Sequence, residues 1–498
     1  MENFIVLEEI LHGIKRSDQN KILQLQQLST TPQQQPAPIK TVALLPAGGL
    51  QQWPPFAQQL LAATSAKEPI LHLTSSAIKQ QMKTLGIRWD PRRSPLDYAA
   101  FANWINQQEQ RHRLVIYQAD LQLSSWTRMC IQQADRILLI AEANSRFQLN
   151  RIENMVWSQR NLVASKQIEL VLIHPNSHCI PYNSKQWLQH RAVKRHHHVE
   201  LHNKQHMQRQ LRFLHNKAVG LVMGSGGFRG FAHFGVLQAL LEHNIPIDYI
   251  GGSSAGAIVA ALVAAGENPH AALKIVQSAL AKHRLLTHYN IPIAFFLQGK
   301  IVEKVFRDIY KQTRMEDLWL NCFATACDLI SGDEITLQQG LVRQNCQASS
   351  AVPGLLAPVA INNMLLVDGG SLNSLPVSTM KRLCNGPVIG VNILANQQTN
   401  WQMPYLYHSL LQMVVNWMRR PLQKDQTAVH PNILSTWNRI LELRWLQNVQ
   451  QANEQIDLFL SVPLENYGIM DSTKADSLFE AGYRYTKKRL EQIDLCSF

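Results

Sequence analysis

Charged side chains are scarce in this chain of 498 residues, because Asp, Glu, Lys and Arg together make up only 17% of it. The seven cysteines include no C-x-x-C pair, which argues against a disulfide framework or a structural zinc site and indicates a reducing compartment. No apolar run is long enough to cross a membrane, and residues 1–30 lack the features of a signal peptide. We therefore expect a cytoplasmic protein, free or bound peripherally to the inner face of a membrane.

Acidic residues are outnumbered by basic ones, which gives the chain a net charge of +13. Such an excess suggests an anionic partner, and the two candidates are nucleic acid and an anionic membrane surface. The sequence contains no RNP, zinc-finger or helix-turn-helix signature. We therefore expect a membrane surface and no nucleic acid.

Two successive strand-turn-helix patterns lie between Ala218 and Gly266. The second turn carries a G-x-S-x-G spacing at Gly252, Ser254 and Gly256. Between a strand and a helix this spacing predicts a nucleophile elbow, which exposes the serine hydroxyl on a strained turn. The alternative is a serine that only caps the helix.

The first of these two turns runs from Gly224 to Gly230 and is rich in glycine. Gly226 and Gly227 precede a helix, where free N–H groups can stabilise an oxyanion, and Arg229 adds a positive charge. A phosphate-binding loop is the alternative. However, no Gly-Lys-Ser/Thr follows, which excludes a Walker loop, and G-x-G-x-x-G fails in both registers, which argues against a dinucleotide site.

A candidate base follows an apolar strand further along the chain. Asp368 ends the run that begins at Met364, and Gly369 and Gly370 follow it. A carboxylate at a strand end can reach a neighbouring strand end, although an ordinary Asp-Gly turn has the same pattern.

The segments GSGGFRGFAHFGV, GGSSAGA and VDGGSLNSLPV together resemble the patatin-like phospholipases. The resemblance implies a Ser-Asp dyad without a catalytic histidine, with Ser254 as nucleophile and Asp368 as base. It also implies an oxyanion loop made of Gly226, Gly227, Phe228 and Arg229. Only the resemblance excludes His233 as the base, and Ser225 stands where the family usually has glycine.

The region before these motifs alternates strands and helices, which predicts a doubly wound α/β domain over residues 39–182. RHRLVIYQADLQLSSWTRMCIQQADRILLIAEA, from Arg111 to Ala143, resembles the region upstream of the catalytic domain in the neuropathy target esterase branch of the same family. That branch carries cyclic-nucleotide-binding domains further upstream, for which there is no room before residue 40. A nucleotide site at Gly48-Gly49 is the alternative role for this domain.

Residues 183–217 combine many basic side chains with the triplet His196-His197-His198. We expect a solvated basic connector here, and the alternative is a metal site at the histidines. The aromatic-rich region after residue 396 predicts a C-terminal helical extension, in which a helix over 405–417 either roofs an acyl-chain groove or caps the sheet.

The predicted fold is therefore a patatin-like three-layer α/β/α domain preceded by a smaller doubly wound α/β domain. We expect a helical segment and linker over 1–38, the α/β domain over 39–182, the connector over 183–217, the catalytic core over 218–395 and the extension over 396–498. The predicted function is a serine esterase that hydrolyses the acyl ester of phospholipids or lysophospholipids without metal or cofactor. The alternative is a catalytically idle membrane or protein-interaction module.

Overall fold

The computed structural model describes residues 39–64, 70–86, 95–159, 165–284, 299–394 and 433–493. Ile39–Phe498 forms one compact unit. The helical segment and linker predicted over 1–38 lie outside the described residues, as does the helix predicted over 405–417. No helix in the described part of the chain is both long and apolar enough to span a bilayer.

The first sheet has the strand order β2-β3-β1-β4-β5-β6, and its neighbouring strands pair in parallel. Its strands are β1 (Thr41–Pro46), β2 (Ile70–Thr74), β3 (Leu114–Gln118), β4 (Arg136–Glu142), β5 (Gln167–His174) and β6 (Arg195–Glu200). The central strands are buried on both faces, so their sequences are almost continuously apolar, as is typical of parallel sheets.

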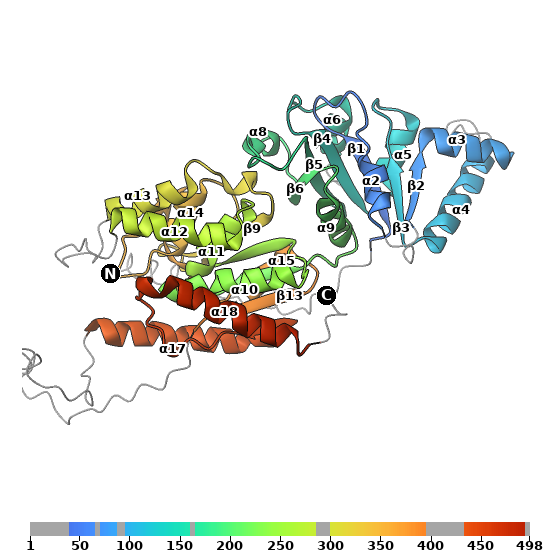
Figure 1. The fold of residues 1–498 in the computed structure, drawn as a ribbon. Helices are drawn as coiled ribbons and strands as arrows, with labels where there is room; N and C mark the ends of the chain where they lie inside the picture. The colour runs from blue at the N-terminus through green and yellow to red at the C-terminus, as the bar shows by residue number, and fades with distance from the viewer. Residues whose placement is uncertain are drawn as a thin grey trace, which may run out of the picture. The chain divides into compact units, whose positions relative to one another are not determined.

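Helices cover both faces of this sheet, which gives the doubly wound arrangement expected from the sequence (Figure 1). The apolar side chains of α2 (Phe56–Ala62) and α9 (Lys204–Leu214) pack on one face. Those of α3 (Ser75–Thr84), α4 (Pro95–Arg111), α5 (Ser125–Gln133) and α6 (Arg151–Ser158) pack on the other.

The segment 183–217 is not the solvated connector that its composition suggested. It contributes α8 (Ser184–Leu188), β6 and α9, and β6 pairs with β5 along the edge of the sheet. Arg191 is buried against Glu153, and Arg209 is buried and donates to the carbonyl of His198. These two arginines serve the fold, so they are not available to bind a membrane surface.

The histidine triplet is likewise part of the fold rather than a metal site. Among the described residues, no group of three or more His, Cys, Asp or Glu side chains is placed to hold a metal ion. The rings of His196 and His198 instead hydrogen-bond to the carbonyl of Glu316, and His197 hydrogen-bonds to Glu169.

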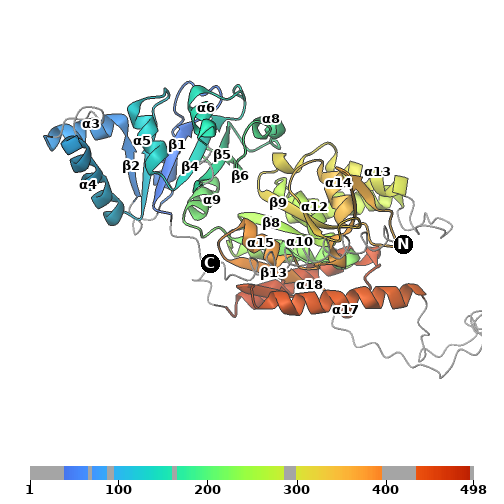
Figure 2. The ribbon, with the colours of Figure 1, turned by 180° about the vertical axis from the view of Figure 1, so that it is seen from behind.

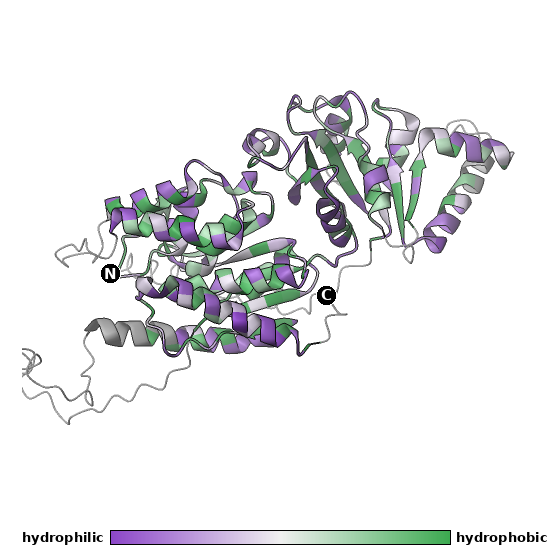
Figure 3. Ribbon diagram, in the orientation of Figure 1, coloured by the Kyte–Doolittle hydropathy of each residue, from purple (hydrophilic) through white to green (hydrophobic). Residues whose placement is uncertain are grey.

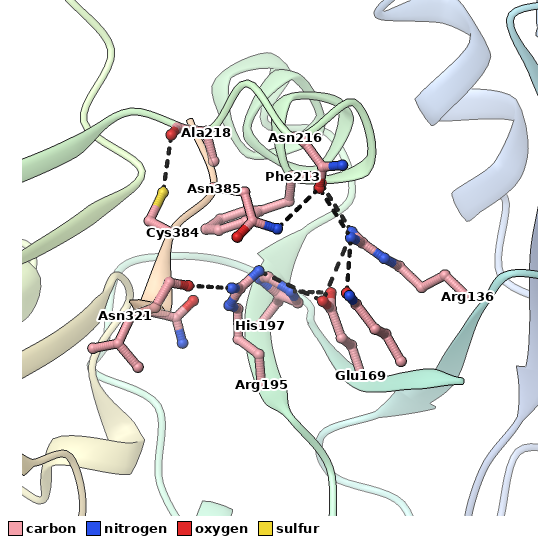
Figure 4. Close-up of polar contacts among 12 residues, drawn as sticks. Arg136, Glu169, Arg195, His197, Phe213, Asn216, Ala218, Asn321, Cys384 and Asn385 are labelled. Carbon is pink, nitrogen blue, oxygen red and sulfur yellow. Dashed lines mark hydrogen bonds and ion pairs between the residues drawn. The ribbon is translucent and has the colours of Figure 1, made fainter. Parts of the chain in front are cut away.

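Buried polar contacts connect this sheet to the rest of the compact unit (Figure 4). Arg136 donates to the carbonyl of Phe213 at 2.8 Å, and Asn321 donates to the carbonyl of His196 at 2.8 Å. Arg195 donates to the carbonyl of Leu383, while its guanidinium lies 3.5 Å from the Glu169 carboxylate.

The second sheet has the order β11-β12-β9-β8-β7-β13-β14, with β10 paired to β9. Its strands are β7 (Gly220–Met223), β8 (Tyr249–Ser253), β9 (Asn321–Asp328), β10 (Glu334–Leu337), β11 (Val359–Ile361), β12 (Met364–Asp368), β13 (Val388–Asn392) and β14 (Leu458–Ser461). The run from β14 to β9 is parallel, and β10, β11 and β12 add antiparallel pairs. The ends of β7, β8 and β12 carry the motifs singled out in the sequence.

This second sheet lies between two helical layers, so the domain is a three-layer α/β/α structure. One layer contains α10 (Phe231–Glu242), α11 (Ala255–Ala264), α12 (Pro269–His283), α13 (Gly299–Tyr310) and α18 (Ala475–Leu490). The other contains α15 (Val377–Leu383) and α17 (Ile433–Asn453), and α15 is in view in Figure 2. Hydrophobic residues follow the strands between the layers (Figure 3).

The C-terminal region is part of this domain rather than a purely helical extension. β14 pairs with β13 and completes the sheet. α18 packs closely on α10, and glycine is required at two contact points. A Cβ at Gly235 would come 1.9 Å from the carbonyl oxygen of Phe479, and one at Gly482 would come 2.2 Å from that of Ala232. These glycines explain why the two helices, distant in sequence, lie side by side (Figure 1).

Candidate active site

Ser254 lies between the end of β8 and the start of α11, on the strained turn that the motif predicted. Its backbone has φ 53° and ψ −121°, a conformation that costs a non-glycine residue about 1–3 kcal/mol. A Cβ at Gly252 would come 2.2 Å from the carbonyl oxygen of Met223, and one at Gly256 would come 2.1 Å from the same atom. Glycine at both positions therefore lets the turn approach β7.

The hydroxyl of Ser254 donates a hydrogen bond to Oδ2 of Asp368 over 2.7 Å. Asp368 is 1% exposed, and its other oxygen, Oδ1, accepts from the N–H of Gly370 at 2.7 Å. Burial raises the pKa of Asp368 to about 6, although the hydrogen bonds from Ser254 and Gly370 partly oppose this effect. A carboxyl group with this pKa is ionised at neutral pH and can still accept a proton.

His233 is placed away from this pair. Its Nε2 hydrogen-bonds to the carbonyl of Gly224 at 2.9 Å, and burial lowers the pKa of its ring to about 4. The side chain is therefore neutral and supports the glycine-rich turn rather than Ser254.

Some groups of the glycine-rich turn are free to bind an oxyanion, and others hydrogen-bond within the fold. Gly227 has φ 57°, which favours glycine, and neither Gly226 nor Gly227 donates its N–H to an acceptor among the described residues. The N–H of Phe228, by contrast, donates to the carbonyl of Ile469, and Nε of Arg229 donates to that of Tyr467. Phe228 and Arg229 were expected in the oxyanion loop. The Phe228 N–H and the Arg229 Nε–H instead donate to the segment before α18.

An apolar pocket of about 190 Å³ opens at Ser254. Aromatic rings from the start of α10 and aliphatic side chains from α11 and α13 form most of its wall. The lining includes Phe231, Phe234, Ile258, Val302, Val305, Phe306, Ile309, Leu355 and Leu356. A pocket of this kind can hold a hydrocarbon chain next to the serine hydroxyl.

Two groups near Ser254 were missed in the sequence. Ser349, in α14 (Val342–Ser349), accepts the N–H of Ser254 at 3.0 Å through its hydroxyl. Trp445 of α17 lines the pocket. The aromatic-rich composition marked the region of Trp445, but no local spacing distinguishes this residue from its aromatic neighbours.

Side chains of the protein itself surround Gly48, the first glycine of the pair after β1. The N–H of Gly48 donates to the Glu153 carboxylate at 2.8 Å, and Arg191 pairs with the same carboxylate at 2.7 Å. A Cβ at Gly48 would meet the carbonyl oxygen of Arg146 at 2.3 Å and the ring of Trp187 at 2.6 Å. A carboxylate therefore occupies the position where a nucleotide-binding loop would hold a phosphate.

Comparisons with known proteins agree with this architecture. Residues 38–222 match the Neuropathy Target Esterase family P-loop like domain, and residues 221–381 match the patatin-like phospholipase domain. Patatin-like phospholipase domain-containing protein 7 of Rattus norvegicus is 28% identical over 485 residues, which cover 90% of this chain and 35% of that protein. Lysophospholipase NTE1 of Meyerozyma guilliermondii is 25% identical over 529 residues, covering 90% of this chain and 36% of that protein.

A solved structure, that of VipD from Legionella pneumophila, shares 12% identity with the chain and gives a TM-score of 0.32. That similarity covers 55% of this chain and 67% of VipD. The chain spans about a third of the length of the curated relatives it matches. An NTE-type P-loop-like domain followed by a patatin-like domain places the chain in the patatin-like phospholipase family, in its neuropathy target esterase branch.

Proposed function

We propose that this protein is a serine esterase that hydrolyses the acyl ester of phospholipids or lysophospholipids through a dyad of Ser254 and Asp368. The observation that carries the proposal is the 2.7 Å hydrogen bond between Ser254 Oγ and Asp368 Oδ2 at an apolar pocket. The mechanism needs neither metal nor cofactor.

In the first half of the reaction, Asp368 takes the proton of the Ser254 hydroxyl as the oxygen attacks the acyl carbonyl carbon. The carbonyl oxygen becomes an oxyanion, which the N–H groups of Gly226 and Gly227 stabilise. The tetrahedral intermediate then breaks its bond to the alcohol portion of the lipid. That leaving oxygen takes the proton from Asp368, and the acyl group stays on Ser254.

In the second half, Asp368 takes a proton from a water molecule that attacks the acyl-enzyme. The ester bond to Ser254 breaks, the proton returns to the serine oxygen, and a fatty acid is released. The starting state of the enzyme is thereby restored.

The substrate class follows from the pocket and from the names of the relatives. An apolar wall selects a hydrocarbon chain, and the similar proteins include one named a lysophospholipase. Because such substrates sit in or near a bilayer, we place the protein at the cytoplasmic surface of a membrane. The net charge of +13 still favours an anionic surface, but the buried arginines of 183–217 do not provide it.

A fluorophosphonate probe tests the proposal, because it labels an activated serine covalently. We expect labelling of wild-type protein at Ser254, mapped by peptide mass spectrometry, and release of fatty acid from a panel of phospholipids and lysophospholipids. Ser254→Ala should lose both signals, whereas Ser76→Ala, at an exposed serine of the first domain, should keep both. Folded wild-type protein that neither reacts nor releases fatty acid would favour the idle module.

A further inference from the structure

The turn between β9 and β10 carries two adjacent aliphatic side chains on the surface. Leu329 is 53% exposed and Ile330 is 71% exposed. Exposed turns normally carry Gly, Asn, Asp or Ser, because these residues suit the backbone of a turn and can hydrogen-bond to it. The requirements of the turn therefore do not explain Leu-Ile at this position.

The carboxylate of Asp328 fixes the conformation of this turn. Its Oδ1 accepts the N–H of Ile330 at 3.3 Å and that of Leu365, in β12, at 3.0 Å. Its Oδ2 accepts the N–H of Ser331 at 3.2 Å, and the N–H of Leu329 donates to the carbonyl of Leu365 at 2.9 Å. Because the backbone is already ordered, the two aliphatic side chains lose little conformational entropy when they contact a partner.

The turn projects beyond the edge of the sheet at which Ser254 lies. β8 and β9 run parallel, and Ser253, the last residue of β8, is opposite Thr325. β9 continues for three more residues to Asp328, which corresponds to roughly 10 Å at the usual rise of a strand. The exposed side chains therefore lie past the level of Ser254 on the same edge of the sheet.

Exposed and half-buried apolar side chains connect this turn to the apolar pocket. Val352, Leu355 and Leu356 line the pocket and are only half buried. The chain then enters β11, where Ala360 lies directly opposite Leu365, and both residues are exposed. Side chains of directly opposite residues share one face of the sheet. Because Leu365 is also hydrogen-bonded to the turn, an apolar surface extends from the wall of the pocket to the turn.

The two segments that build this surface contain few charges. Residues 351–367 contain no Asp, Glu, Lys or Arg, and residues 321–342 contain no Lys or Arg. Asp333, which follows the turn, is exposed. An anionic membrane would therefore find no cation in these segments and would repel this carboxylate. Neutral headgroups and hydrocarbon fit the surface better.

We propose that Leu329, Ile330 and Leu365 form a docking surface that enters the interfacial region of a zwitterionic bilayer. Burial of apolar side chains, rather than attraction between charges, provides the contact. An acyl chain can then pass from the bilayer to the pocket along apolar side chains and is shielded from water on the way. The inference rests on the proposed function, because only a lipid substrate has to make this passage to Ser254.

Co-sedimentation with vesicles of phosphatidylcholine tests the docking surface. The full chain carries Ser254→Ala in this assay, so that the lipid is not consumed. We expect binding at low salt and equally at high salt. Replacing both Leu329 and Ile330 by Ser should weaken binding about 10- to 100-fold, because each aliphatic side chain would no longer be buried in the bilayer. Ile330→Trp should keep binding or strengthen it, since tryptophan favours the membrane interface.

Two activity assays separate docking from catalysis. With Ser254 intact, the Leu329→Ser, Ile330→Ser variant should hydrolyse lipid in phosphatidylcholine vesicles about 10- to 100-fold more slowly than wild type. It should keep the wild-type kcat/KM for a small soluble ester, because neither residue lines the pocket. The matched control is Leu85→Ser, Leu121→Ser, which changes two exposed leucines of the first domain. This control should alter neither binding nor either activity.

Four results would overturn the inference. They are binding that requires anionic lipid and is lost at high salt, unchanged vesicle binding in the Ser variant, equal loss of both activities in that variant, and a wild-type dimer, seen by light scattering, that the variant dissociates. The last result would assign the surface to a second copy of the chain. Failure of wild-type protein to hydrolyse any ester would count against the proposed function, and the vesicle binding would still be measured independently.

Discussion

Asp368 and Glu169 are both 1% exposed, but the surroundings of these two buried carboxylates shift their pKa values in opposite directions. Asp368 accepts hydrogen bonds from a serine and a backbone N–H, and burial raises its pKa to about 6. Burial also acts to raise the pKa of Glu169. The charges of Arg195 and Arg136 and the hydrogen bond from His197 outweigh it, however, and lower that pKa well below its usual range (Figure 4).

This difference separates a carboxylate that can exchange a proton from one that cannot. Glu169 is held permanently charged by cations that also bind carbonyls across the polar contacts of the unit. Asp368 is buried without a neighbouring cation, and this costs stability. The same burial raises its pKa, so the carboxylate is able to accept a proton near neutral pH. Removing the charge of Asp368 should therefore abolish activity and raise stability, whereas removing the charge of Glu169 should lower stability.

The largest expected effect is on activity. Asp368→Asn and Ser254→Ala should each lower kcat for ester hydrolysis by about 10⁴- to 10⁶-fold, because members of a catalytic unit fail together. For the same reason, the double variant should be little worse than either single one. Steady-state assays of purified protein, with circular dichroism to verify folding, measure this. Wild-type activity in Asp368→Asn would mean that the base lies elsewhere.

The next largest effect is on stability, at the other carboxylate. Glu169→Gln leaves Arg136 and Arg195 buried beside an uncharged group, so we expect a loss of about 3–5 kcal/mol in the free energy of unfolding. Denaturant titration at pH 7 measures it. Glu480→Gln, which removes an exposed partner of Arg484, is the control and should change stability by less than about 1 kcal/mol. Equal, small losses would show that the buried cluster contributes little.

A smaller effect of the opposite sign is expected for Asp368. Because its folded pKa lies above the ordinary value of 3.8, burial of Asp368 reduces stability progressively as the pH rises from about 3.8 to about 6, and the full cost is present above pH 6. Asp368→Asn removes this cost and should stabilise the protein on the order of 1–3 kcal/mol at pH 8. At pH 4 the gain should largely vanish. Destabilisation by Asp368→Asn at pH 8 would show that its hydrogen bonds outweigh the cost of burial.

Local sequence was sufficient for the region around Asp368 and insufficient for the region around Glu169. The glycines at 252 and 256 are needed wherever a strand turns sharply into a helix against a neighbouring strand, so the position of Ser254 follows from spacing alone. Asp368 was placed correctly at the end of a strand for a similar reason. Its distance to Ser254 depends on the pairing of β12 with β9, which only the fold provides.

The segment 183–217 was misjudged because composition counts charges but not their partners. Arg195 and His197 have their carboxylate in β5, and Arg191 has its carboxylate in α6. Those acids lie outside the segment, so its charge appears uncompensated. The places of Trp445 and of the Phe228 N–H likewise depend on contacts between segments distant in sequence. Trp445 of α17 lines the pocket at Ser254, and the Phe228 N–H donates to the carbonyl of Ile469.

The smallest and most selective effect concerns pH. Asp368 can serve as the base that we propose only when it is ionised, so kcat/KM should fall about tenfold per pH unit below about pH 6. The Glu169 cluster has the opposite linkage sign to Asp368. Its lowered pKa contributes stability above the ordinary value of 4.5, and this stability is lost as the pH falls below that value. Activity should therefore decline reversibly between pH 6 and pH 5 while the protein stays folded, with unfolding only at lower pH. Parallel measurement of kcat/KM and of circular dichroism from pH 4 to pH 8 separates the two carboxylates. If activity and folding are lost at the same pH, the acid limb reports unfolding rather than the titration of Asp368.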